Sequence, residues 1–153
     1  MEQYENTIAI QNYLPHRAPM LLVDVIVELN ERVVKTIFEI KESTLFVENN
    51  VFAEVGLIEN AAQTCSAIVG KSYYTDENNQ EKENVNLIGF ISGIKKLKIH
   101  QLPKVGQVIK TTATLDSRFD SDDYSICTMV CMIFDNEAVL FEAEINLFIQ
   151  ETK

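Results

Sequence analysis

Residues 54–70 constrain the fold of this chain more than any other segment. The apolar residues of this stretch recur at three- and four-residue steps, the period of an α-helix: Leu57, Ile58, Ala61, Cys65, Ile68 and Val69. Most of the other residues are small, so a sheet can approach the helix closely on several sides. The pattern predicts a buried central helix over about residues 55–73.

Two polar side chains interrupt this apolar helix, Glu59 and Gln63. They lie four residues apart and therefore share a face. A carboxylate buried without a partner costs free energy. Glu59 is therefore either a solvent-facing glutamate or a functional carboxyl group, which apolar surroundings can keep protonated as a general acid.

Length and charge exclude several classes of protein. The 153 residues fit a single domain, residues 1–153, with a real core. The formal net charge of −10 argues against nucleic acid or an anionic membrane as partner, because both attract basic surfaces. The chain opens with acidic residues, lacks a signal-like apolar run and contains no stretch that approaches a membrane span. We expect a cytoplasmic protein.

The three cysteines, Cys65, Cys127 and Cys131, form no CxxC pair. An odd number without metal-ligand spacing suggests neither a disulfide framework nor a zinc site, and the histidines add no metal-binding pattern. Cys127 and Cys131 lie four residues apart in an alternating segment, which places both on one face of a strand. We expect buried thiols in a reduced compartment, and no metal.

Strand-like segments lie on both sides of the helix. A short helix over residues 7–14, ended by Pro15, leads to a predicted hairpin at residues 20–29 and 32–40. Residues 41–53 and the polar residues 74–86 read as loops. Four further strands rich in Val, Ile, Thr and Phe are predicted at residues 87–100, 108–119, 124–134 and 138–149.

This order predicts an α+β fold in which an antiparallel sheet of about six strands wraps around one long helix. We expect the last four strands to form a meander, and the first hairpin to pair with them. Such a sheet has open edges, and joining two copies edge to edge covers them. The sequence therefore predicts a dimer.

His16, one of two histidines, lies in a loop that Pro15 and Pro19 hold extended. Neutral imidazole is a suitable general base near pH 7. The alternative is a structural histidine bonded to backbone groups. The residues alone leave both roles open.

Three segments carry a family resemblance. The run Leu14-Pro15-His16-Arg17, leading into Leu21-Leu22-Val23-Asp24, closely resembles the opening of the bacterial (3R)-hydroxyacyl-acyl carrier protein dehydratases. Glu59-Asn60-Ala61-Ala62-Gln63 resembles the helix motif of that family, and residues 94–106 are similar to the family strand that ends in a proline-glycine-aspartate turn. The resemblance covers nearly the whole chain, implies the hot-dog fold and extends to a subgroup in aryl polyene and flexirubin-type pigment pathways.

The resemblance implies elimination of water from a β-hydroxyacyl thioester in fatty acid or polyene biosynthesis. In this family a histidine and a helix carboxylate meet across the dimer interface. Glu59 matches the carboxylate and Gln63 its neighbour, while peptide N–H groups near Val55 and Gly56 would face the thioester oxygen. The resemblance also implies that the substrate is attached to the phosphopantetheine arm of an acyl carrier protein. No metal or redox cofactor is expected.

The chain departs from the family before the helix. The family histidine lies in a histidine-phenylalanine-proline-glycine segment, whereas residues 45–52 are shorter and contain no histidine and no proline. His16 would then replace the missing base, or Glu59 would act with water as a thioesterase. In a third hypothesis the chain is a catalytically impaired subunit that binds acyl thioesters or pairs with an active dehydratase. Asn49 and Asn50 are then polar remnants at the cavity mouth, although turn formation explains them equally well.

An acyl carrier protein is acidic, so its docking site requires a local basic patch. The best candidates are Lys95, Lys96 and Lys98, followed by His100 and Lys104. The competing interpretation is the solvated face of a strand.

Overall fold

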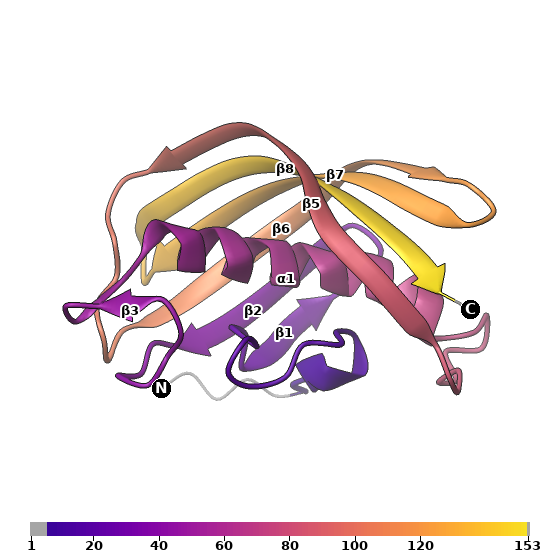
Figure 1. The fold of residues 1–153 in the computed structure, drawn as a ribbon, viewed down its shortest axis with the longest axis horizontal. Helices are drawn as coiled ribbons and strands as arrows, with labels where there is room; N and C mark the ends of the chain where they lie inside the picture. Colours follow the sequence, from indigo (N-terminus) through magenta and orange to yellow (C-terminus); the bar gives the residue numbers. More distant parts are fainter. Residues whose placement is uncertain (1–5, 153) are drawn as a thin grey trace.

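The computed structural model describes residues 6–152 and contains one long helix enclosed by an antiparallel sheet (Figure 1). The six-stranded sheet has the order β1-β2-β6-β7-β8-β5. Its strands are β1 (Val25–Leu29), β2 (Val33–Glu39), β5 (Asn86–Ile99), β6 (Val108–Asp120), β7 (Tyr124–Asp135) and β8 (Ala138–Thr152). The α+β hot-dog arrangement is thereby confirmed.

Helix α1 (Glu54–Tyr74) lies along the concave side of the sheet, as Figure 1 shows. Its predicted bounds are correct to one residue at each end. Leu57, Ala61 and Cys65 are fully buried, and so is Val69 on a neighbouring face. The small residues of the helix let the sheet surround it, which explains why its apolar pattern extends nearly all round.

The prediction of a four-stranded meander was wrong for one strand. Strands β6, β7 and β8 follow one another as antiparallel neighbours, but β5 pairs with β8 rather than with β6. The first hairpin explains the difference, because β2 pairs with β6 and so occupies the edge that β5 would need. Strand β5 therefore crosses to the far edge of the sheet.

The N-terminal region is also less regular than predicted. In place of a helix over residues 7–14 there is only a 3-10 turn, η1 (Ile10–Asn12), because the backbone of Ile8 pairs with Ile26 of β1. The first strand begins at Val25 instead of at residue 20. The intervening backbone at Leu22 is bonded to side chains of α1.

The predicted loop over residues 41–53 contains a small hairpin, β3 (Val47–Glu48) and β4 (Val51–Phe52). Asn49 and Asn50 form its turn with φ angles of 51° and 66°, a conformation that asparagine tolerates better than most residues. The turn alternative for this asparagine pair therefore has direct structural support.

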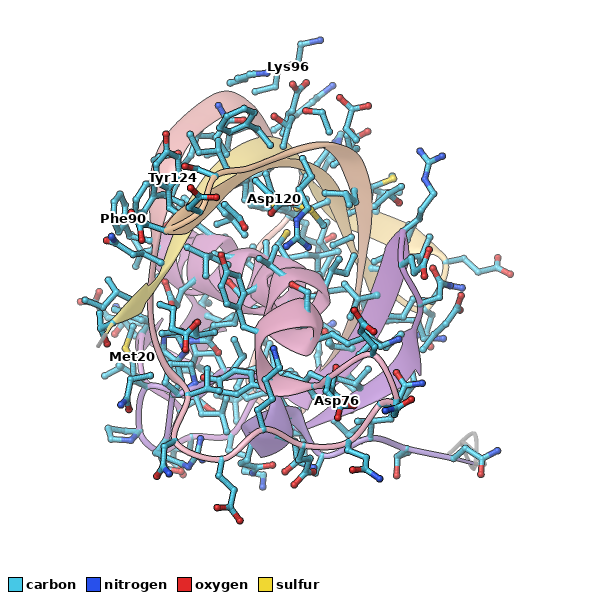
Figure 2. All side chains as sticks on the ribbon, turned by 90° about the vertical axis from the view of Figure 1, so that its right-hand side faces the viewer. Met20, Asp76, Phe90, Lys96, Asp120 and Tyr124 are labelled. Atoms are coloured by element: carbon cyan, nitrogen blue, oxygen red, sulfur yellow. The ribbon has the colours of Figure 1, made fainter. Side chains whose placement is uncertain are left out.

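Strand β5 is an open edge with large apolar side chains on its surface. Ile88, Phe90, Ile94 and Leu97 are all exposed. Figure 2 places Phe90 and Tyr124 outside the sheet, on the side away from the helix, and both rings stack on Phe148. A long apolar edge strand is a surface on which a second chain can pair.

Candidate active site

The His16 loop is fixed by its own hydrogen bonds. The Arg17 guanidinium donates through Nη1 to the carbonyl oxygens of Leu14 at 2.9 Å and His16 at 2.8 Å. The Arg17 carbonyl in turn accepts from the N–H groups of Met20 and Leu21. These bonds tie the backbone on either side of His16 to the Arg17 side chain and to Met20 and Leu21.

The loop brings His16 to Glu59. Nε2 of His16 lies 3.7 Å from Oε1 of Glu59, with 30% and 23% of the two side chains exposed. Gln63, one helical turn after Glu59, donates through Nε2 to the same carboxylate oxygen at 2.9 Å. The two residues predicted from sequence as the acid-base candidates thus face one another within one chain.

The two nitrogens of the His16 ring differ in their surroundings. Nδ1 is buried and has no hydrogen-bond partner among the described residues. The bond to a backbone group expected of a structural histidine is therefore missing at this atom. Nε2 is the nitrogen directed at Glu59.

A cavity of about 210 Å³ lies beside His16. Its walls come from the His16 loop, from the second half of α1 and from strands β5 and β8: Tyr13, Leu14, Pro15, His16, Ser66, Gly70, Leu87, Ile88, Gly89 and Ile149. Most of these side chains are apolar. Because β5 is the open edge of the sheet, a chain paired with it would lie close to this cavity.

Gln63 is 1% exposed, and its amide is already bonded to protein groups. Oε1 accepts from the N–H of Leu22 at 2.8 Å, and Nε2 donates to the carbonyl of Met20 at 2.8 Å as well as to Glu59. Both amide hydrogens are therefore used within the chain. Substrate binding by Gln63, predicted from sequence, would require one of these bonds to break.

The other four residues predicted to bind substrate make no hydrogen bonds to the His16–Glu59 pair among the described residues. Val55 is exposed in the first turn of α1, whereas Gly56 is buried and its N–H donates to the carbonyl of Ala53 at 3.0 Å. Asn49 and Asn50 are exposed at the β3–β4 turn. The roles of all four residues therefore stay predictions.

Asn60 was missed by the sequence reasoning. It is fully buried, donates to the carbonyl of Leu22 at 2.7 Å and accepts from the Thr111 hydroxyl at 2.6 Å. The signal was available, because an asparagine on the buried side of an apolar helix needs partners. The sequence did not show which distant groups would supply them.

The predicted basic patch is partly neutralised. Lys95 pairs with Glu144 at 3.1 Å, and His100 pairs with Glu142 at 2.7 Å. These pairs favour the solvated-strand interpretation for that part of β5.

The cysteines are core residues, as predicted. Burial, reinforced by the Cys131 thiol at 3.0 Å, raises the pKa of the Cys65 thiol well above its usual value. A protonated buried thiol is a poor nucleophile.

Among the described residues, no cluster of three or more His, Cys, Asp or Glu side chains could hold a metal ion. Within the same residues, no helix has both the length and the apolar character of a membrane span.

Comparison with known proteins identifies the family of the chain. Residues 8–153 match the family of ApeP-like proteins, described as ApeP dehydratase. The 3-hydroxyacyl-[acyl-carrier-protein] dehydratase FabZ of Petrotoga mobilis is 30% identical over 106 residues, which cover 66% of this chain and 69% of FabZ.

Solved structures share the fold at low sequence identity. The dehydratase heterocomplex ApeI:P from Xenorhabdus doucetiae contains a chain with a TM-score of 0.72 and 15% identity, with coverage of 95% of this chain and 92% of that one. A hypothetical thioesterase with coenzyme A from Streptococcus pneumoniae TIGR4 has a TM-score of 0.57 and 13% identity, with coverage of 84% and 86%. The chain belongs to the ApeP-like dehydratases, a hot-dog family of hydro-lyases of the 3-hydroxyacyl-acyl carrier protein dehydratase type.

Proposed function

We propose that this chain removes water from a β-hydroxyacyl thioester with His16 and Glu59 of the same chain as its reactive pair. The observation that carries the proposal is the 3.7 Å approach of His16 Nε2 to Glu59 Oε1 beside an apolar cavity. Elimination needs a group that takes the C2 proton and a donor for the hydroxyl that leaves C3. The facing carboxyl can carry the proton from C2 to the hydroxyl, and the imidazole can donate a hydrogen bond to the departing oxygen.

The roles follow from the surroundings of the ring. Because Nδ1 is buried, Nε2 is the nitrogen directed toward the site, and as an N–H it is a hydrogen-bond donor. The Glu59 carboxylate then takes the C2 proton, the C–H electrons form the C2–C3 double bond, and the C3–O bond breaks. In a syn elimination the same carboxyl returns the proton to the departing hydroxyl, which leaves as water while Nε2–H of His16 bonds to its oxygen. This order gives the base role to Glu59 instead of His16.

The substrate proposed is an acyl thioester on the phosphopantetheine arm of an acyl carrier protein, which the description of the FabZ relative supports. The apolar cavity beside His16 would take part of the acyl chain. Dehydration by an acid-base pair requires no metal or redox cofactor.

The test is turnover of a β-hydroxyacyl thioester by the purified protein with Glu59→Gln and His16→Ala. Each variant should lose about 10²- to 10⁴-fold in kcat. The chain offers a matched control, since His100, which directly follows β5, and Glu142 of β8 form a second pair at 2.7 Å. His100→Ala and Glu142→Gln should retain activity within about twofold. Release of free thiol that depends on Glu59 alone would instead identify a thioesterase.

A second candidate function is that of one subunit in a heteromeric dehydratase. Two observations favour it: the ApeI:P structure is a heterocomplex, and β5 exposes Phe90 and Ile94 at an open edge. The chain would then pair with a related hot-dog dehydratase through β5, and the partner would supply the histidine that residues 45–52 lack. Activity that appears only on mixing, and that Ile94→Lys abolishes, supports this candidate. Failure to form a complex in size-exclusion chromatography overturns it.

A further inference from the structure

Two side chains of helix α1 form hydrogen bonds with the backbone of Leu22, in the place of bonds from a neighbouring strand. Asn60 Nδ2 donates to the Leu22 carbonyl at 2.7 Å, and the Leu22 N–H donates to Gln63 Oε1 at 2.8 Å. Both backbone groups of Leu22 are therefore satisfied by the amides of two residues on one helix. We call Asn60 and Gln63 the amide clamp.

The amide clamp is connected to both members of the reactive pair. On one side, Gln63 Nε2 donates to Glu59 Oε1 at 2.9 Å. On the other, it donates to the Met20 carbonyl at 2.8 Å, and the Met20 N–H donates to the Arg17 carbonyl at 3.0 Å. The Arg17 side chain completes the path at the His16 carbonyl. These hydrogen bonds, linked through the covalent structure of Met20 and Arg17, connect the helix carboxylate to the backbone of His16.

The clamp is itself anchored to the sheet. Asn60 is fully buried, and its Oδ1 accepts from the hydroxyl of Thr111 in β6 at 2.6 Å. A buried amide that loses a partner destabilises the folded chain, because no water replaces the lost bond. This penalty opposes any shift of Leu22 along the helix.

We propose that Asn60 and Gln63 are positioning residues, which hold the His16 loop over α1 and so set the spacing between His16 and Glu59. Neither amide needs to touch the substrate for this role. The consequence for turnover rests on the proposed function, whereas the spacing is a property of the folded chain and can be measured separately.

The test compares Asn60→Ala and Gln63→Met with Thr64→Val. The control also removes a buried hydrogen bond of α1, between the Thr64 and Thr36 hydroxyls at 2.7 Å, but it leaves the bonds to Leu22 in place. In NMR spectra, nuclear Overhauser contacts between the His16 ring and the Glu59 side chain should weaken in both clamp variants and persist in the control. Their kcat should fall by about 10- to 100-fold with a smaller change in KM, because misplacement of reacting groups by about 1 Å has an effect of this size.

Two outcomes overturn the proposal: clamp variants that keep the native His16–Glu59 contacts, or a Thr64→Val protein that loses them equally. If the native protein turns over no substrate, the proposed function fails, but the NMR comparison still decides the role of the clamp. Should Asn60→Ala not fold, Thr111→Val removes only the anchor of Asn60. It should weaken the same contacts to a smaller extent, and unchanged contacts would count against the proposal.

Discussion

The ring of His16 combines a buried nitrogen without a partner and a second nitrogen that faces a carboxylate. A buried N–H without an acceptor costs about 1–3 kcal/mol. We therefore infer that the neutral ring holds its proton on Nε2, the nitrogen that faces Glu59. This asymmetry is a property of one residue and can be tested without substrate.

We predict that ¹⁵N NMR of the neutral His16 ring shows a protonated Nε2 and an unprotonated Nδ1. Assignment uses the His16→Ala protein, in which these signals disappear. His100, whose Nε2 lies 2.7 Å from Glu142, provides an internal reference for a histidine paired with a carboxylate. A protonated Nδ1 in His16 would contradict the roles assigned to the pair.

At the scale of elements, the thinness of α1 determines how closely the N-terminal segment approaches it. Gly70 and Tyr13 both line the cavity beside His16. A Cβ atom added at Gly70 would lie 2.5 Å from the carbonyl oxygen of Tyr13, which is a backbone atom and cannot rotate away. The close packing of α1 against Tyr13 therefore also shapes the wall of the cavity beside His16.

We predict that Gly70→Ala lowers the free energy of unfolding by about 1–3 kcal/mol, the usual effect of overpacking. This loss outweighs the helix propensity of alanine, which alone would favour the variant by about 1 kcal/mol. Urea denaturation measures the change. Gly93→Ala is the control, because its Cβ would come no closer than 3.8 Å to Asn146 Nδ2. Equal effects at the two positions would show that the Tyr13 contact is not the cause.

At the scale of the whole molecule, stability at alkaline pH depends on buried thiols. Burial raises the pKa of Cys127 from 9.0 to about 11. Between these values the unfolded chain releases a proton that the folded chain keeps. Cys127 therefore contributes stability that is fully present below about pH 9 and is lost as the pH rises toward 11.

We predict that the stability of Cys127→Ala declines less steeply over this interval than that of the native chain. The variant starts from a lower stability at neutral pH, since removing a buried sulfur leaves a small cavity. Thermal unfolding at a series of pH values measures both effects. Parallel profiles for the two proteins would exclude Cys127 as a source of the alkaline loss.

The local spacing of apolar residues was sufficient to predict where the long helix and the long strands lie in the chain. The three- and four-residue spacing of apolar side chains predicted α1 to within a residue at each end, and alternation located the four long strands. The same spacing placed Glu59 and Gln63 on one face, where a hydrogen bond joins them. These features depend on residues close in the chain, so the sequence by itself determined them.

Tertiary structure decided how distant segments meet. Strand β5 pairs with β8 because β2 already occupies the edge of β6, a competition that no single segment encodes. His16 meets Glu59 because the backbone of Met20 and Leu22 is bonded to Asn60 and Gln63, which lie 38 to 43 residues away along the chain. The sequence shows that a buried amide needs hydrogen-bond partners. Which groups become its partners depends on how the sheet packs around the helix.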